Sequence, residues 1–500
     1  MMARFTTLDY TVFAVYLVGS ALLGYAFTKK KQESVKEFLL AGRSMGSFMV
    51  GISILAAMFS GISYLGAPSE VYAHDASYTL VTLCFFIATP VTTALFIPFF
   101  YRAKFFTAYH YLEERFSVGV RTLASALFIT RVLLWLALAI YAPALALEQV
   151  TGLPLWFMIV VTGSLATFYA AKGGIKAVIW VDAIQFIVLF GGQLLIFIVA
   201  FWQIPGGVVG AYDLARAGGK ITVNLSLDPM VRVTLWGLVI GQAFHALVQM
   251  ATDQVAVQRY MTATSLKTAQ RGLWMRLWIS LPVVSLFYLS GVALYAYYQS
   301  QHFDPLASGA IRKADQILPY FVVNALPAGM GGLLISAVFS ASMNVCSSGI
   351  NALTAAGLMD FYKRLWRPDV SDAEQLRLAR WMTIGFGVLV MVLAFVVERM
   401  GTLVEGSVKM MALTGGPLLG LFFLGMLSKR ANAKGAIMGW LVGIAVLLPI
   451  CFATKVSFLW HACIGCVVTY VAGFIASTLF AAESKPLDGL TVATRYVSEE

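Results

Sequence analysis

The chain has 500 residues, of which 60% are hydrophobic and 12% are charged, and its formal net charge is +11. A chain with so few polar residues cannot form a polar surface around an apolar core. This composition excludes a soluble globular protein and indicates an integral membrane protein. The excess of basic residues does not indicate a nucleic-acid-binding protein, because these residues are concentrated in alternate loops between apolar segments, as membrane topology requires.

Apolar segments of about 20 residues, the length that a helix needs to cross the hydrocarbon core, recur along the whole sequence. The sequence has no run of alternating segments of the kind that builds a membrane β-barrel. It therefore predicts an all-α integral membrane protein with about 13 transmembrane helices. In chain order the predicted spans are 8–28, 47–73, 77–102, 119–149, 155–171, 176–203, 232–255, 271–298, 329–357, 378–398, 403–427, 434–453 and 457–481.

The distribution of lysine and arginine predicts the orientation of these spans. The loops on one side, which include the cluster 29–31, Arg102 and Lys429, hold most of the basic residues. The positive-inside rule places that side in the cytoplasm, with the N-terminus outside and a cytoplasmic tail at 482–500. The first span is followed by its basic cluster rather than preceded by it, so we interpret it as a retained helix and not as a secretory signal. We expect a multi-pass protein of the plasma (inner) membrane.

Two spans contain features that do not suit a plain lipid-facing helix. Gly61, Gly66 and Pro68 interrupt the second span in its middle, and polar side chains follow one another in the seventh span, at Gln242, His245, Gln249 and Asp253. Unwound backbone at membrane depth is tolerated where it lines a cavity or binds a ligand. Broken helices at corresponding positions of two halves indicate the substrate site of a secondary transporter.

The interval between the two interrupted spans suggests an internal repeat. Spans two and seven are five apart, which predicts two five-helix repeats, 47–203 and 232–427, within a single transporter domain, 1–500. An extra first helix, 8–28, precedes the repeats, and two extra helices, 434–481, follow them. A kink that serves only packing is the alternative for one break. Two breaks, with Ser60, Ser63 and Ser69 beside the first, favour a binding site.

Five motifs, in order and at compatible spacing, resemble those of the sodium/solute symporter family. They are YLGAPSEVY at 64–72, GGIKAVIWVDAIQ at 173–185, DQVAVQRY at 253–260, SASMNVCSSGIN at 340–351 and GMLSKRANAKGA at 425–436. The resemblance covers nearly the whole chain and is to the bacterial sialic acid symporters and the iodide, multivitamin and monocarboxylate branch. It implies a LeuT-type core of 5+5 inverted repeats, an outside N-terminus and Na+ as the coupling ion.

The resemblance also implies two sodium sites. At the first, backbone carbonyls and two side chains match Ala56, Phe59, Ala341, Asn344 and Val345. Val345 departs from the family pattern, because it has no oxygen where a hydroxyl is expected. The second site matches Asp182, Ser347 and Ser348. For Asp182 two alternatives stay open, an ion pair with Lys172 or Lys176 and the uptake of a proton that would support proton coupling.

Substrate contacts are implied on several core helices. The matching residues, together with the polar residues of the second interrupted span, are Ser60, Ser63, Tyr78, Thr82, Trp135, Gln242, His245 and Gln249. Sialic acid symporters hold the substrate carboxylate with an arginine where this chain has Trp135. Arg131 lies one turn earlier on the same helical face and is a further candidate, with extension to the membrane interface as its alternative. A structural hydrogen bond is the alternative for His245.

These features predict sodium-coupled symport of a small polar or anionic organic solute, such as a monocarboxylate, a sialic acid or a vitamin-like compound, into the cytoplasm by alternating access. The alternative is a proton-coupled or uncoupled carrier of the same fold that uses Asp182, and a solute-sensing membrane protein is less supported. The histidines are dispersed and no acid–base or metal cluster is evident, so we expect no enzyme. The expected partners are the solute and the lipid bilayer, without nucleic acid; the sequence specifies no oligomeric state.

Overall fold

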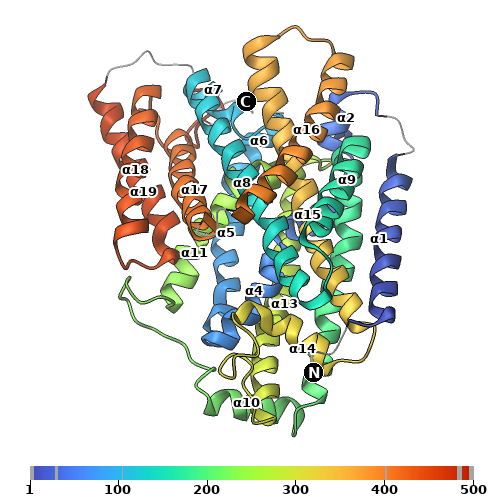
Figure 1. Cartoon of the computed structure of the whole chain (residues 1–500). Coiled ribbons are helices and arrows are strands. Elements are labelled where there is room, and N and C mark those ends of the chain that lie inside the picture. Colours follow the sequence, from blue (N-terminus) through green and yellow to red (C-terminus); the bar gives the residue numbers. More distant parts are fainter. Residues whose placement is uncertain (1–4, 29–31, 104, 400–402, 481–486, 495–500) are drawn as a thin grey trace.

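The computed structural model describes residues 5–28, 32–103, 105–399, 403–480 and 487–494. This part of the chain is all-helical and contains no β-strand apart from an isolated bridge between Met45 and Ala263 (Figure 1). Within it, 9 helices are long and apolar enough to cross a membrane, or 10 if one bent pair is counted as a single span. The prediction of an all-α, multi-pass membrane protein is confirmed, whereas the count of about 13 spans stays a prediction.

The helices of the first half of the chain have the following bounds. They are α1 Thr7–Thr28, α2 Val35–Leu40, α3 Ser47–Met58, α4 Gly61–Ala73, η2 Ala76–Cys84, α5 Phe85–Val91, η3 Thr92–Phe96, α6 Ile97–Arg102, α7 His110–Arg115, α8 Val118–Thr151, α9 Leu155–Trp202 and α10 Gly207–Ala217. Residues 76–102 form one continuous candidate span that combines η2, α5, η3 and α6.

The second half contains the remaining helices. They are η4 Gly237–Gly241, α11 Gln242–Leu247, η5 Val248–Thr252, α12 Gln254–Met261, α13 Leu266–Ser300, η6 Ala314–Gln316, α14 Ile317–Ala325, α15 Met330–Ala356, η7 Gly357–Trp366, α16 Asp372–Arg399, α17 Leu403–Leu427, α18 Ala433–Ala453, η8 Phe458–Trp460 and α19 His461–Leu479; a further short helix of the first half is η1 Ala41–Arg43. Four short helices, α2, α7, α10 and α14, lie outside the predicted spans, because helices of 6 to 11 residues are too short to give a transmembrane signal.

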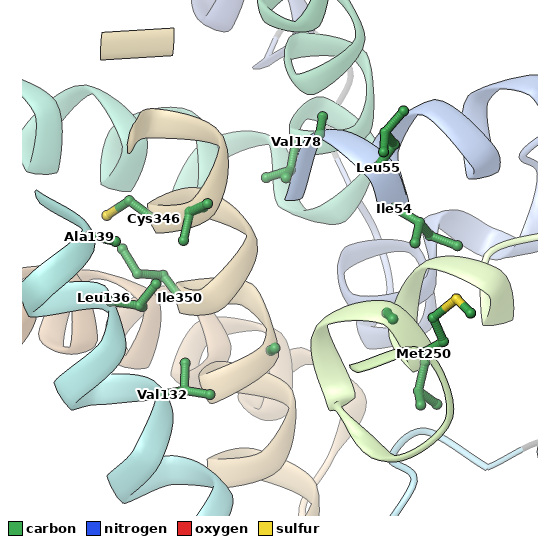
Figure 2. Close-up of a cluster of buried hydrophobic side chains, with 14 of the residues drawn as sticks. Ile54, Leu55, Val132, Leu136, Ala139, Val178, Met250, Cys346 and Ile350 are labelled. Carbon is green, nitrogen blue, oxygen red and sulfur yellow. The ribbon is translucent and has the colours of Figure 1, made fainter. Parts of the chain in front are cut away.

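Helix α15 lies in the middle of the bundle and packs against α3, α4, α8 and α9 (Figure 1). Its sequence is rich in glycine, alanine and serine, which allow helix backbones to approach closely within a membrane. A side chain at Gly349 would place its Cβ 2.6 Å from the Leu136 side chain. Figure 2 shows Leu136 and Ala139 of α8 beside Cys346 and Ile350 of α15. Small residues thus hold α15 tightly between its neighbours.

The extra helices predicted at the two ends of the chain lie at the edges of this bundle. Helix α1 packs against α9 and α15 on one side, and α18 and α19 pack against each other and α17 on the other (Figure 1). The predicted tail, 482–500, falls within the described residues only at 487–494. There the Tyr111 hydroxyl donates to the Leu490 carbonyl at 2.8 Å, and the Val492 amide donates to the Met426 carbonyl at 2.9 Å. This stretch of the tail therefore packs on α7 and α17.

Buried ion pairs fix the end of the bundle that carries α6 and α7. Asp360 accepts hydrogen bonds from Arg121, Thr107 and Ser125, with the Arg121 Nη2 atom 2.6 Å from Asp360 Oδ1. Glu113 on α7 accepts from Arg121 and Arg364, both at 2.6 Å. Burial by itself would raise the pKa of Glu113, but the two guanidinium donors bring this pKa below its ordinary value. The network joins α7, α8 and η7.

Helix α9 covers both predicted spans 155–171 and 176–203, and it has a kink at Gly174 where a loop at 172–175 was predicted. Within its bounds, Leu155 and Trp202, Gly174 alone leaves the helical conformation, at φ 58° and ψ −160°. A Cβ at Gly174 would lie 2.6 Å from the Phe38 carbonyl oxygen. The chain bends at this point without a loop because glycine adopts a positive φ without strain.

We expect Gly174→Ala to destabilise the protein by about 1–3 kcal/mol, because alanine at this φ is strained and its Cβ meets the Phe38 carbonyl. The measurement is the thermal unfolding temperature of the purified protein in detergent. Gly191→Ala is the matched control on the same helix, since a Cβ there meets no atom within 4 Å. An equal unfolding temperature for the two variants would contradict the role of Gly174.

Candidate functional site

The second predicted span is broken at two residues, Phe59 and Ser60. Helices α3 and α4 meet there at a bend of 68°, and both residues have extended backbone angles. Ser60 starts α4, because its Oγ accepts a hydrogen bond from the Ser63 amide at 3.2 Å. The expectation that Gly66 and Pro68 also interrupt the segment is wrong. Both lie inside α4, and the break falls before them because the Ser60 cap begins a new helix.

Gly61 allows the break to pack tightly against two other helices. A Cβ at Gly61 would lie 2.5 Å from Pro143 Cγ on α8 and 2.7 Å from Ser342 Oγ on α15. Only glycine fits at such a close approach without movement of its neighbours. The break is therefore held directly against the region of α15 that carries the predicted sodium ligands.

The second break lies at Asp253, at the end of the predicted polar run. Two stretches of wide helical turns, η4 and η5, flank α11, and the helix stops at Thr252. Asp253 has extended angles, φ −83° and ψ 123°, and its Oδ1 accepts from the Val255 amide at 2.9 Å to start α12. The polar side chains of the run thus lie on a helix that widens at both ends, and the chain opens one residue after η5.

Two adjoining cavities lie beside these breaks. The first, of about 370 Å³, contacts α3, α4, α11 and α13, and the second, of about 380 Å³, contacts α8, α11, α12 and α15. Six residues line both cavities, namely Met58, Tyr78, Gln242, His245, Gln249 and Phe458. Each cavity is therefore bordered by one of the breaks, and polar side chains of α11 and η5 line both.

The predicted substrate residues fall into four groups. Tyr78, Gln242, His245 and Gln249 line both cavities, Ser63 lines the first, and Arg131 and Trp135 line the second. Ser60 and Thr82 are buried and are in neither lining; Thr82 donates to the Thr79 carbonyl at 3.3 Å. Within the shared set, Gln242 donates to the Tyr78 hydroxyl at 3.4 Å, and Gln249 and His245 lie 3.1 Å apart. Seven of the nine residues meet at the cavities, and their roles in binding stay predictions.

Arg131 forms an ion pair in the lining of the second cavity. Its Nη2 atom lies 2.6 Å from Asp253 Oδ2, and the two side chains are 9% and 13% exposed. The side chain of Arg131 therefore turns inward to an acid and does not extend to the membrane interface. This contact joins α8 to the residue at which the second broken helix opens.

The residues of the first predicted sodium site lie where α15 packs on the first break. The Ala56 carbonyl accepts from the Phe59 amide at 3.2 Å, so that α3 ends with a tight turn. Ala341 and Asn344 are fully buried on α15. Neither side-chain atom of the Asn344 amide has a hydrogen-bond partner within the described residues. Val345 lines the second cavity. The arrangement offers an unused amide oxygen beside the break.

Asp182 forms a buried ion pair that the sequence did not reveal. Its Oδ2 lies 2.9 Å from Arg259 Nη2, with both side chains fully buried, and also accepts from Ser53 Oγ at 2.9 Å. The predicted alternative of a pair with Lys172 or Lys176 is wrong, because α12 brings Arg259 to Asp182 from the other half of the chain. Arg259 stands in the quoted motif 253–260, directly after the second break, and this position was the available signal.

The two serines of the second predicted sodium site differ in their contacts. Ser348 Oγ accepts a hydrogen bond from Arg259 and lies 3.4 Å from Asp182 Oδ2. Ser347 Oγ donates to the Asn344 carbonyl at 3.2 Å. Asp182 Oδ1 is buried and has no hydrogen-bond partner among the described residues. The structure thus brings these three residues together, but Arg259 already balances the charge of Asp182.

We expect Asp182→Asn and Arg259→Gln each to destabilise the protein by about 3–5 kcal/mol, because each leaves an uncompensated buried charge. The double variant should lose clearly less than the sum of the two losses, since both charges are then removed together. Thermal unfolding of the two single variants and the double variant measures this coupling. Strictly additive losses would show that the pair does not interact.

The sequence matches one protein family over most of its length. The model of the family "SSF: Sodium:solute symporter family" matches residues 38–443. The chain is 36% identical to the sodium-dependent multivitamin transporter of Oryctolagus cuniculus over 447 residues, which is 88% of this chain and 70% of that protein. It is 35% identical to the sodium-coupled monocarboxylate transporter 1 of Homo sapiens over 449 residues, 89% of this chain and 73% of that protein.

A solved structure has the same overall arrangement. It is described as the substrate-bound, outward-open state of a Na+-coupled sialic acid symporter, and it superposes with a TM-score of 0.90. The two chains are 30% identical, and the match covers 97% of this chain and 100% of the other. A nucleobase-cation-symport-1 family transporter, 13% identical with a TM-score of 0.55, shares the fold over 89% of this chain and 96% of that one.

Proposed function

Because the chain belongs to the sodium:solute symporter family, in which Na+ is the coupling ion, we propose that it is a secondary active transporter that uses a sodium gradient to carry a small anionic organic solute into the cytoplasm. The observation that carries this proposal is the pair of broken helices, α3–α4 and α11–α12, each of which borders one of the adjoining cavities. Broken helices that meet at a cavity are the arrangement from which alternating-access transporters build their sites.

Na+ is a hard cation and requires oxygen ligands. We place the first ion at the carbonyls of Ala56, Phe59 and Ala341 with the amide oxygen of Asn344. The unused Asn344 amide and the extended backbone at Phe59 support this placement. We place a second ion at Asp182, Ser347 and Ser348, where the unpartnered Asp182 Oδ1 is the supporting observation. Arg259 balances Asp182, so an ion there would add a net positive charge.

The solute binds, in this proposal, at the polar residues shared by the two cavities, Tyr78, Gln242, His245 and Gln249, with Ser63, Arg131 and Trp135 nearby. Ser60 and Thr82, the other two candidates for substrate contact, are buried outside both linings. An ion at the first break would stiffen the contact between α3 and α15 and favour one state of the cycle, and solute would then favour closure. Ion and solute must strengthen each other's binding for coupling to occur.

The finer architecture belongs to the same proposal. We propose thirteen spans, with the core 47–203 and 232–427 as 5+5 inverted repeats, the N-terminus outside and the basic end, which carries α6 and α7, in the cytoplasm of the plasma (inner) membrane. The kink at Gly174, which divides α9 into two parts, supports the repeat boundary within 155–203. The high TM-score with a Na+-coupled sialic acid symporter supports the same arrangement.

Uptake into proteoliposomes tests the coupling. We expect an inward sodium gradient to drive accumulation of a solute from a panel of monocarboxylates, vitamins and sialic acids, and we expect potassium or choline to fail. The measurement is radiolabelled uptake with and without a sodium ionophore. Uptake that is unchanged when every inward sodium gradient is removed would overturn sodium coupling; uptake that follows a proton gradient would favour the alternative through Asp182.

Val345→Thr tests the proposed first sodium site. Threonine has nearly the shape of valine and supplies the missing hydroxyl, so we expect the apparent sodium affinity to rise about 2- to 10-fold. Val132→Thr is the matched control, because Val132 is a buried valine that lines the same cavity from α8. The measurement is the sodium dependence of thermal stabilisation or of uptake. An equal effect of the two substitutions would argue against a sodium ion beside Val345.

A further inference from the structure

Arg276 is a buried cation in the wall of the first cavity. It lies on α13 and is 2% exposed. Its Nη1 atom lies 3.0 Å from the Met250 sulfur, its Nη2 atom lies 3.3 Å from the Met58 sulfur, and its guanidinium carbon lies 4.4 Å from the centre of the Phe85 ring. Its Nε atom has no hydrogen-bond partner among the described residues. Two thioethers and an aromatic face therefore hold the guanidinium in place.

The other charged side chains that line the two cavities are already neutralised within the protein. Glu70 accepts two hydrogen bonds from Arg232, at 2.6 and 2.9 Å, and Asp253 pairs with Arg131 at 2.6 Å. No carboxylate lies within 4.0 Å of the Arg276 nitrogens in the part of the chain that the structure describes. The linings thus contain one cation that no acid of these residues balances.

Such a cation is costly unless a ligand shares the site. A guanidinium keeps its charge in proteins, and a thioether sulfur is a weak hydrogen-bond acceptor that does not replace an oxygen. A buried charge without a partner costs several kcal/mol. A carboxylate is the group that suits a guanidinium best, because its two oxygens accept two parallel hydrogen bonds. The position of Arg276 therefore favours a ligand with one negative charge.

The other residues that line the first cavity indicate the chemical character of the rest of that ligand. Aromatic and aliphatic side chains make up most of its wall: Phe59, Val81, Phe85, Val284, Phe287 and Tyr288. Four polar side chains, Tyr78, Gln242, His245 and Gln249, are shared with the second cavity, and Ser63 and the Arg232-paired Glu70 line the first cavity alone. A volume of about 370 Å³ accepts a small organic molecule. This lining suits a hydrocarbon or an aromatic ring better than a polyhydroxylated chain.

We propose that Arg276 is the anchor for the carboxylate of a monocarboxylate substrate whose apolar or aromatic body packs among the aromatic side chains of the first cavity. Arg131 is not the anchor, because Asp253 engages it. This inference rests on the proposed transport function, and it adds to that function the residue that binds the negatively charged group of the solute. Arg276 thereby determines specificity for acids over neutral molecules of the same shape.

Binding of matched acids and amides to the purified full chain in nanodiscs, in sodium buffer, tests the proposal by calorimetry. The probes are phenylacetate with phenylacetamide, hexanoate with hexanamide, and nicotinate with nicotinamide. We expect at least one acid to bind about 30-fold or more tightly than its amide, as the loss of one partner of a buried charge pair implies. Equal affinity for acid and amide, or no binding of any acid at millimolar concentration, overturns the proposal.

Variants then assign the preference to Arg276. Arg276→Gln should reduce the acid-to-amide ratio to within about threefold while it leaves amide binding nearly unchanged, and Arg276→Lys should keep part of the preference. Arg271→Gln, an exposed arginine on the same helix, is the matched control and should keep the full ratio. If Arg276→Gln weakens acid and amide equally, Arg276 has only a structural role, and the proposal fails.

Two further measurements distinguish an inorganic anion from a carboxylate as the ligand of Arg276. They also distinguish a failure of sodium coupling from a failure of the Arg276 proposal. Iodide is titrated as an inorganic anion, and binding of iodide alone, lost in Arg276→Gln, would overturn the carboxylate assignment. The preference for acids over amides is measured without a gradient. If this preference is preserved while uptake is independent of sodium, sodium coupling is refuted and the role of Arg276 stands. Sodium-driven uptake of an acid without loss of preference in Arg276→Gln would refute the anchor and leave coupling intact.

Discussion

The structure depends on the way in which polar backbone is satisfied at the depth of the membrane. A continuous helix satisfies its own amides and carbonyls, whereas Phe59 and Ser60 leave the helical conformation between α3 and α4. Ser60 compensates by capping α4, Gly61 lets α8 and α15 close around the bend, and the tight turn at Ala56 ends α3. These contacts stabilise the break although Phe59 and Ser60 leave the helical conformation.

Two of the buried ion pairs lie next to these breaks, in addition to the network of Arg121, Glu113 and Asp360 at the end that carries α6 and α7. Asp182 pairs with Arg259 and Arg131 pairs with Asp253, and each pair joins a helix of the first half of the chain to the segment around the second break. Buried pairs of this kind contribute less to stability than to position, because desolvation offsets much of their attraction. They hold α12 in register with α8 and α9, which keeps the cavity walls in place. Arg276 differs from these residues because its contacts are thioethers and an aromatic ring.

Polar side chains of α11 and η5 belong to the linings of both cavities. Gln242 and Gln249 each make one side-chain contact, with Tyr78 and His245, and both residues line both cavities. A solute in either cavity therefore has the same polar side chains within its lining. This arrangement suits a carrier whose two gates open in turn.

The sequence by itself determined the class of the protein, because hydropathy and the positions of basic residues directly reflect the solvent on each side of a segment. It also located both broken helices, since glycine and polar residues are unusual in the middle of a lipid-facing helix, and it named seven of the side chains that line the cavities. The exact break points required the structure. Gly66 and Pro68 lie inside α4, because the helix already begins at the Ser60 cap. The second break is at Asp253, at the end of the polar run. The partners of Asp182, Arg131 and Arg276 were decided by tertiary packing alone, because Arg259, Asp253 and Met58 approach them from distant parts of the chain. Composition and periodicity indicate whether each helix is surrounded by lipid, water or protein. The pairing of buried charges depends instead on which helices are neighbours, and only the packed bundle specifies that.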